Sequence, residues 1–283
     1  MVAEARIGCE LERIVLARIA SDKLVLPAMP AAATRCLELL RDPCYQQHRV
    51  IATLESDPLL AASVLHAAST AAAGGTATRL DQAIGRLGAE RLQQAVIEYA
   101  AHQLFRSSNP RIAAANRKVW QHSVAVALLA RELATPSGCD GDAAYLAGLL
   151  HDLGKPVIAA MLLEAERQLG QRTRWLDDAG WTRIVESAHR KVGVAIAAKW
   201  QLPEDVAAAI ADCSDYDPAH RTGVANVVRL ANAIAKREGY ATGAVDRADL
   251  DAMIMVGQSM IGADDAIVAR LAAGVAEKVG QLR

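Results

Sequence analysis

The sequence predicts an all-α protein. Apolar residues recur at three- and four-residue steps in one segment after another, which is the period of a helix with one buried face. Prolines and glycines divide these segments into short units, and no segment shows the alternation typical of a strand. Only one phenylalanine occurs among 283 residues, 52% of which are hydrophobic. Alanine, leucine, valine and isoleucine must therefore fill the core, and such side chains let helices approach closely.

The first half of the chain predicts short helices joined by tight turns. They end at prolines, glycines and Asp-Pro steps, which do not continue a helix. The strongest break is Ser107–Pro110, so we expect an N-terminal helical lobe over residues 1–110. The expected helices cover residues 10–20, 31–41, 50–55, 59–72, 80–88 and 89–105.

The second half predicts longer helices with the same period. We expect a second helical lobe over residues 111–238 and a C-terminal helical extension over residues 239–283. His122 lies on the apolar stripe of the first of these helices, where a lone histidine is more often a packed core residue than a ligand. The expected helices cover residues 112–134, 143–150, 161–169, 181–200, 204–211, 223–236, 250–261 and 264–279.

Composition limits the classes of function. The formal charge is −1 and the pI is about 6.7, so the composition does not show the excess of basic residues that is typical of nucleic-acid-binding proteins. Five cysteines, odd in number and without a CxxC pair, fit reduced thiols. Residues 58–78 carry no formal charge, but they are rich in alanine, serine, threonine and glycine, which insert poorly into a membrane. We expect a cytoplasmic protein with neither a nucleic-acid nor a membrane partner.

One short helix is expected to carry the chemistry of the chain at its end. Asp142 is placed to cap the start of the helix over residues 143–150 with its carboxylate. Gly154 and Pro156 are expected to end the helical run.

At that end a histidine and an aspartate adjoin, and a lysine follows. An imidazole nitrogen of His151 and a carboxylate oxygen of Asp152 suit zinc, manganese or iron, and Lys155 is placed to face a phosphate oxygen. The alternative is a capped helix end with a hydrogen-bonded histidine, because a lone His-Asp pair is common.

Six segments together resemble the HDOD domain, the regulatory relative of the HD-type metal-dependent phosphohydrolases. They occur in the family's order and carry its LP, DP, LG and GLLHD marks. The resemblance implies an all-helical fold in which an N-terminal helical lobe packs on an HD-like lobe. The segments are LPAMP (26–30), IATLESDPLLAASVL (51–65), LDQAIGRLGAERL (80–92), VWQHSVAVALLARELA (119–134), YLAGLLHDLGK (145–155) and ESAHRKVGVAIAAKWQLP (186–203).

The resemblance also implies a metal site. Its ligands would be His122, the pair His151-Asp152 and a later aspartate, whose position Asn232 occupies here. Relatives with two metals add a histidine that matches His189, and we expect these histidines and Asp152 to converge in one cavity.

The same two-metal relatives carry a further His-His pair, at a position that Asp212-Cys213 fills in this chain. The candidate catalytic residues are Asp152 and Lys155, the latter matching a phosphate-facing residue. The site therefore resembles a partly dismantled hydrolase centre.

Three functions remain open at this point. The first is a non-catalytic signalling module that binds other signalling proteins. The second is a metal-dependent phosphohydrolase or phosphodiesterase, and the third is a receptor that binds a nucleotide or a metal ion without turnover. The resemblance to the HDOD domain favours the first function, and the missing charge at Asn232 argues against the second.

Overall fold

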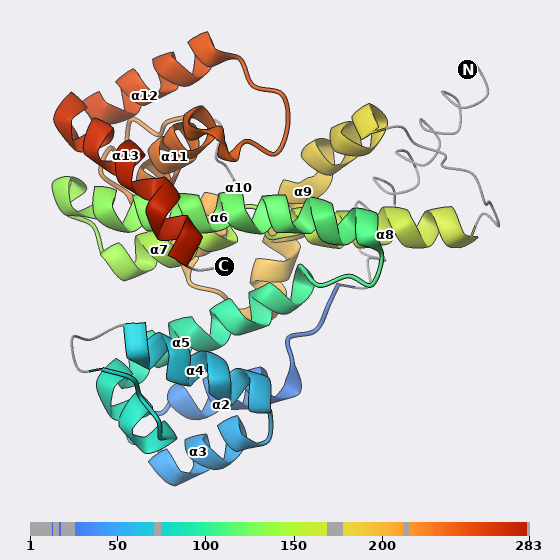
Figure 1. Ribbon diagram of the computed structural model, residues 1–283, viewed down its shortest axis with the longest axis vertical. Coiled ribbons are helices and arrows are strands. Elements are labelled where there is room, and N and C mark those ends of the chain that lie inside the picture. Colours follow the sequence, from blue (N-terminus) through green and yellow to red (C-terminus); the bar gives the residue numbers. More distant parts are fainter. Residues whose placement is uncertain are drawn as a thin grey trace. The chain divides into compact units, whose positions relative to one another are not determined.

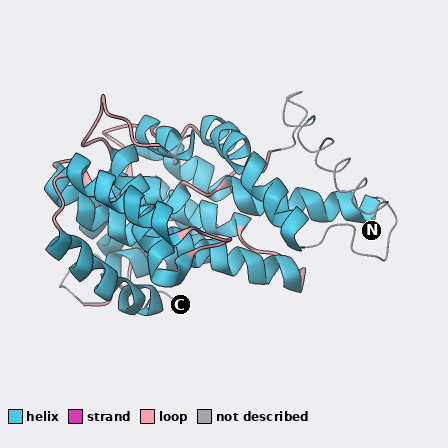
Figure 2. Ribbon diagram, turned by 90° about the horizontal axis from the view of Figure 1, so that it is seen from above, coloured by secondary structure: helices cyan, strands magenta, loops and turns pink. Residues whose placement is uncertain are grey.

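The computed structural model describes residues 26–70, 75–168, 178–211 and 215–281, together with Arg13 and Ala17. Within these residues every regular element is a helix (Figure 2), which confirms the predicted all-α fold. The helix expected over residues 10–20 lies outside the described ranges.

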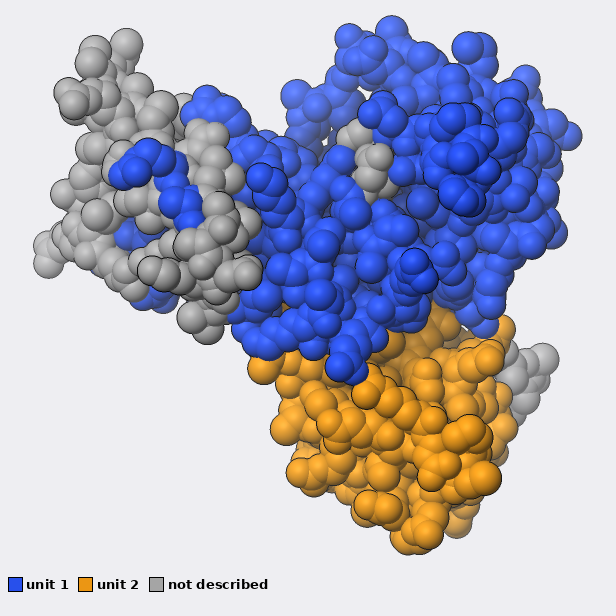
Figure 3. Space-filling model, turned by 180° about the vertical axis from the view of Figure 1, so that it is seen from behind, with its two compact units in different colours: residues 1–27, 105–283 blue, residues 28–104 orange. Residues whose placement is uncertain are grey.

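The chain divides into two compact units (Figure 3). One comprises Ala28–Leu104, and the other comprises Met1–Pro27 with Phe105–Arg283. The division falls a few residues before the Ser107–Pro110 break.

The smaller unit contains four helices in its described part. In it α2 packs against α3 and α5, and α4 packs against α5. Gly88 interrupts α5 with a φ of 68°, a left-handed conformation that favours glycine, so the break expected at this residue is present as a kink. The helices are α2 (Ala31–Leu40), α3 (Gln47–Glu55), α4 (Pro58–Thr70) and α5 (Leu80–Leu104).

Asp57 caps the start of α4 and links this helix to α5 through a hydrogen bond. Its Oδ1 accepts hydrogen bonds from the amides of Leu59 and Leu60 at 3.1 and 3.2 Å, which are donors that the first turn leaves unpaired. Its Oδ2 accepts from the hydroxyl of Tyr99 on α5 at 2.7 Å. Pro58 is the first helical residue, as its fixed φ and missing amide proton favour.

The larger unit is built around α6, which packs against α7, α8, α11 and α13 (Figure 1). Its core consists of aliphatic side chains, including Leu133, Leu149 and Ile158, all of which are buried. The elements are α6 (Pro110–Ser137), α7 (Gly141–Leu150), α8 (Gly154–Gln168), α9 (Asp178–Trp200), α10 (Glu204–Ala211), α11 (Val224–Ala235), the π-helical turn η1 (Lys236–Tyr240), α12 (Arg247–Ile261) and α13 (Asp265–Gln281).

The start of α7 differs from the sequence prediction. Asp140, not Asp142, caps this helix, because α7 begins two residues earlier than expected. Oδ1 of Asp140 accepts from the amides of Asp142 and Ala143 at 2.7 and 3.1 Å. The carboxylate of Asp142 instead pairs with Arg131 of α6 at 3.2 Å.

The region after Leu150 is also more helical than predicted. Gly154 and Pro156 do not end a helix; they form the first turn of α8. A proline is tolerated there because the first-turn amides have no partner within the helix.

One stretch, Gly141–Arg167, would be long and apolar enough to span a membrane by length and composition. In this protein 83% of its apolar window is buried inside the fold, as in a core helix. The pair Arg247–Ile261 and Asp265–Gly280 passes the same test only when joined across a bend of 119°.

Candidate metal centre

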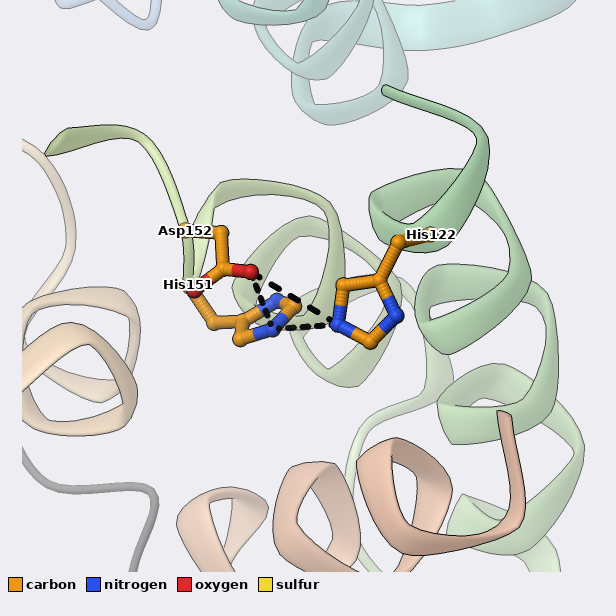
Figure 4. Close-up of side chains that lie close together, drawn as sticks. All are labelled: His122, His151 and Asp152. Atoms are coloured by element: carbon orange, nitrogen blue, oxygen red, sulfur yellow. Dashed lines mark hydrogen bonds and ion pairs between the residues drawn. The ribbon is translucent and has the colours of Figure 1, made fainter. Parts of the chain in front are cut away.

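Two helices and one turn supply the three histidines and Asp152 of the candidate site. His122 comes from the middle of α6 and is fully buried, and His189 comes from α9. His151 and Asp152 lie in the three-residue turn that joins α7 to α8. In Figure 4 both point toward the ring of His122.

Two glycines allow these helices to approach closely. A Cβ on Gly148 would lie 3.0 Å from the Cα of Ala127, so α7 contacts the backbone of α6 directly. A Cβ on Gly154 would overlap the carbonyl oxygen of His189 and lie 2.9 Å from the amide nitrogen of Gly193. The turn that carries His151 and Asp152 is thus held against both neighbouring helices.

The four expected residues come together. Nε2 of His122 lies 3.2 Å from Nε2 of His151 and 3.6 Å from Oδ2 of Asp152. Nε2 of His151 lies 3.4 Å from the same oxygen, and Nε2 of His189 lies 3.5 Å from Oδ1. One ligand atom from each of His122, His151 and Asp152 falls within 4.8 Å of the others, so one ion can contact all three.

Backbone carbonyls set the tautomers of two histidines. Nδ1 of His151 lies 2.7 Å from the carbonyl oxygen of Gly148, and Nδ1 of His189 lies 2.9 Å from that of Glu186. A carbonyl only accepts, so Nδ1 carries the proton in both rings and Nε2 keeps its lone pair. This is the arrangement by which proteins orient a histidine toward a metal.

The tautomer of His122 follows from that of His151. Because the lone pair on Nε2 of His151 faces His122, Nε2 of His122 carries the proton and donates a hydrogen bond to His151 in the metal-free protein. Its buried Nδ1 has no hydrogen-bond partner within the described residues.

Burial keeps the imidazoles neutral. Removal from water lowers the pKa of His122 to about 3, and it also lowers the pKa values of His151 and His189. Burial alone would raise the pKa of Asp152, but His151 and the Lys155 ammonium outweigh it and hold that pKa well below its usual range. The site therefore offers neutral imidazoles and an ionised carboxylate, the protonation states that a metal requires.

Lys155 is buried next to this cluster. Its Nζ lies 2.9 Å from Oδ2 of Asp152, 2.8 Å from Oε1 of Glu186 and 3.1 Å from Oγ1 of Thr242. Burial would lower the pKa of Lys155, but the two carboxylates raise it on balance, so the amine is charged. The ammonium is therefore held by ion pairs to two carboxylates and by a hydrogen bond that it donates to Thr242.

Asn232 lies on α11, which packs against α6 and α7. Its side chain is buried, and its amide oxygen has no hydrogen-bond donor within the described residues. Lys236, four residues later and thus on the same face, is close enough to lower the pKa values of His122 and His151. This face of α11 is therefore directed toward the cluster.

The residues fit a divalent metal. Imidazole nitrogens together with a carboxylate suit zinc, manganese or iron. His122, His151 and Asp152 would hold the ion, and His189 faces the other oxygen of Asp152. Asp212 and Cys213 lie outside the described residues.

Sequence reasoning missed two members of the site. Glu186 and Thr242 complete the surroundings of Lys155, but nothing local marks Thr242, which is 87 residues from Lys155. The spacing of Glu186 one turn before His189 was the only available signal.

Solved structures show the same fold. A protein from Shewanella amazonensis, provisionally described as a metal-dependent phosphohydrolase, is 22% identical with a TM-score of 0.69, covering 97% of this chain and 100% of that one. An HDOD domain protein with unknown function from Geobacter sulfurreducens is 24% identical with a TM-score of 0.64, covering 98% of this chain and 97% of that one.

Curated proteins are similar in sequence to this chain over part of their own length. Ribonuclease Y of Thermus thermophilus is 31% identical over 157 residues, which are 56% of this chain and 22% of that protein. The chain spans 41% or less of the length of each curated relative that it matches. The family model of the HDOD domain matches residues 26–216, well over half of the chain. The chain therefore belongs to the HDOD domain family.

Proposed function

We propose that this protein is a non-catalytic regulatory module that acts by binding other signalling proteins. Its HD-like site binds a divalent metal weakly and does not hydrolyse phosphodiesters. The cluster of His122, His151 and Asp152 then serves as a binding site and not as a hydrolytic centre.

The observation that carries this proposal is the charge around the cluster. The charged side chains that act most strongly on His151 are one carboxylate, Asp152, and two ammonium groups, Lys155 and Lys236. Glu186 offsets the charge of Lys155. The surroundings are therefore close to neutral, and a divalent cation gains little from them.

Asn232 explains how this balance arises. An aspartate at this position would make the surroundings negative and would supply a strong oxygen donor. The amide supplies only a neutral oxygen, so an ion bound here is held less tightly. When bound, a metal would polarise a nearby oxygen atom, but weak occupancy limits that chemistry.

The alternative is a metal-dependent phosphodiesterase, which the resemblance to Ribonuclease Y favours. Asn232→Asp separates the two functions. The variant is expected to bind manganese or zinc about tenfold more tightly by titration calorimetry, because a charged ligand replaces a neutral one. Its hydrolysis of a cyclic dinucleotide is expected to stay at background, because one ligand does not rebuild a second metal position.

Gln82→Glu makes the same change of charge at an exposed side chain of α5, outside the ligand set. This control is expected to leave metal affinity unchanged. Equal affinity of Asn232→Asp and the native protein would contradict the assigned position of Asn232. Metal-dependent turnover by the native protein would contradict the non-catalytic function.

A further inference from the structure

A pocket of about 510 Å³ opens beside the candidate metal centre, within the larger unit. The first turns of α6 and α9 form most of its wall, and Lys155 and Ala159 of α8 contribute on the metal-centre side. This volume is within the range of about 300–1,000 Å³ that is usual for small-molecule sites.

The pocket combines apolar walls with a flat, charged surface. The guanidinium of Arg111 lies 4.6 Å from the centre of the Trp181 ring, a cation–π arrangement that holds both planar groups. Ile112, Val119 and Val185 add apolar surface around them. A planar ring of a ligand can stack on such a surface.

Among the described lining residues, positively charged side chains outnumber negatively charged ones. Arg111, Lys118 and Lys155 are cationic, and Glu186 is the anionic residue among the described lining residues. Lys118 is exposed at the pocket, where an anion of the ligand can reach it.

The partners of Lys155 differ in how easily a ligand can displace them. Asp152 is buried with 5% of its side chain exposed, whereas 43% of the Glu186 side chain is exposed. Glu186 belongs to the pocket lining, so an anionic group entering the pocket meets Glu186 and Lys155 together. Exchange of one anion for another at the ammonium leaves no buried charge unpaired.

We propose that this pocket binds a small anion with a planar ring, whose anionic group displaces Glu186 from Lys155 and whose ring stacks beside Arg111 and Trp181. A nucleoside monophosphate and an aromatic carboxylate share this chemistry. The site goes beyond the proposed function, because it requires neither a metal ion nor a protein partner.

Titration calorimetry in the presence of EDTA tests the site. The probes are 5′-AMP and 5′-GMP, the aromatic carboxylate 2-naphthoate, and the separate parts adenosine and inorganic phosphate. One of the two ligand classes is expected to bind at least about tenfold more tightly than the separate parts, because ring and anion act together. The class that binds more tightly identifies the anion as phosphate or carboxylate.

Three variants locate the binding. Lys118→Gln is expected to weaken binding about two- to fivefold, as for one exposed charge. Arg117→Gln, exposed on the same helix but outside the lining, is the matched control and is expected to have no effect. Glu186→Gln is expected to strengthen binding about tenfold, because the competing carboxylate becomes neutral.

Absence of binding by every probe at millimolar concentration would overturn the proposal. Equal effects of Lys118→Gln and Arg117→Gln, or weaker binding by Glu186→Gln, would also overturn it. These measurements involve neither a metal ion nor turnover. A negative result for the pocket therefore does not contradict the regulatory function, and a negative result for that function does not contradict the pocket.

Discussion

Replacement of Gly154 by alanine is expected to destabilise the protein and to disturb the metal centre. The added Cβ would overlap the carbonyl oxygen of His189 and approach the amide nitrogen of Gly193 to 2.9 Å. Both are backbone atoms of α9, so no side-chain rotation relieves the overlap. The helices α8 and α9 must move apart, which carries His189 away from Asp152.

The magnitude follows from these contacts. Overpacking in a core costs about 1–3 kcal/mol, and backbone atoms on the opposing side place Gly154→Ala toward the upper end. The higher helix propensity of alanine offsets little of this loss. Its advantage of about 1 kcal/mol over glycine applies to helix interiors, whereas Gly154 is the first residue of α8. We expect a net loss of about 2–3 kcal/mol in the free energy of unfolding.

Urea denaturation followed by circular dichroism measures this loss. Gly274→Ala in α13 is the matched control, because its added Cβ meets no atom within 4 Å. It should raise stability by about 0.5–1 kcal/mol, as alanine does inside a helix. If Gly154→Ala were as stable as this control, the close crossing of α8 and α9 would be wrong.

Two further outcomes follow from the buried groups. The pKa of His122 is about 3 in the folded protein and 6.5 in the free side chain. As the pH falls, the unfolded chain therefore protonates His122 at a higher pH than the folded protein does. Stability of the metal-free protein is therefore complete above pH 6.5 and falls as pH drops toward 3, by about 1 kcal/mol at pH 5.5 from this group. Urea midpoints at pH 7.5 and 5.5 in EDTA should differ accordingly, and an equal midpoint would contradict the burial of a neutral imidazole. Asp57→Ala should cost about 1–3 kcal/mol, because α4 loses its cap and the Tyr99 hydroxyl loses its acceptor; Asp57→Asn should recover part of this loss in the same assay, and equal loss in both variants would exclude the cap.

The sequence predicted the helices well because periodicity reports which face of a helix is buried. His122 illustrates this point, since its place on the apolar stripe of α6 agrees with its complete burial. The boundaries were less accurate. Asp140 and Asp142 are both good caps, and only the exact start of α7 decides which carboxylate reaches the free amides.

The surroundings of Lys155 could not be predicted from local patterns. Its contact with Thr242 depends on the path of the chain after η1, and its contact with Glu186 depends on how α9 lies against α8. Gly154 was interpreted as a helix end, whereas the structure uses its missing side chain to admit the backbone of α9. Such roles arise from contacts between distant segments, which composition and spacing do not report.

Turnover by the native protein tests the central claim most directly. Hydrolysis of a cyclic dinucleotide and of bis(p-nitrophenyl) phosphate should be measured with added manganese or iron, beside a His151→Ala variant. That variant should remain folded with a loss of about 1–3 kcal/mol, as for a lost buried hydrogen bond. Background rates are expected for both proteins. Metal-dependent cleavage by the native protein that is abolished in the folded His151→Ala variant would contradict the non-catalytic function.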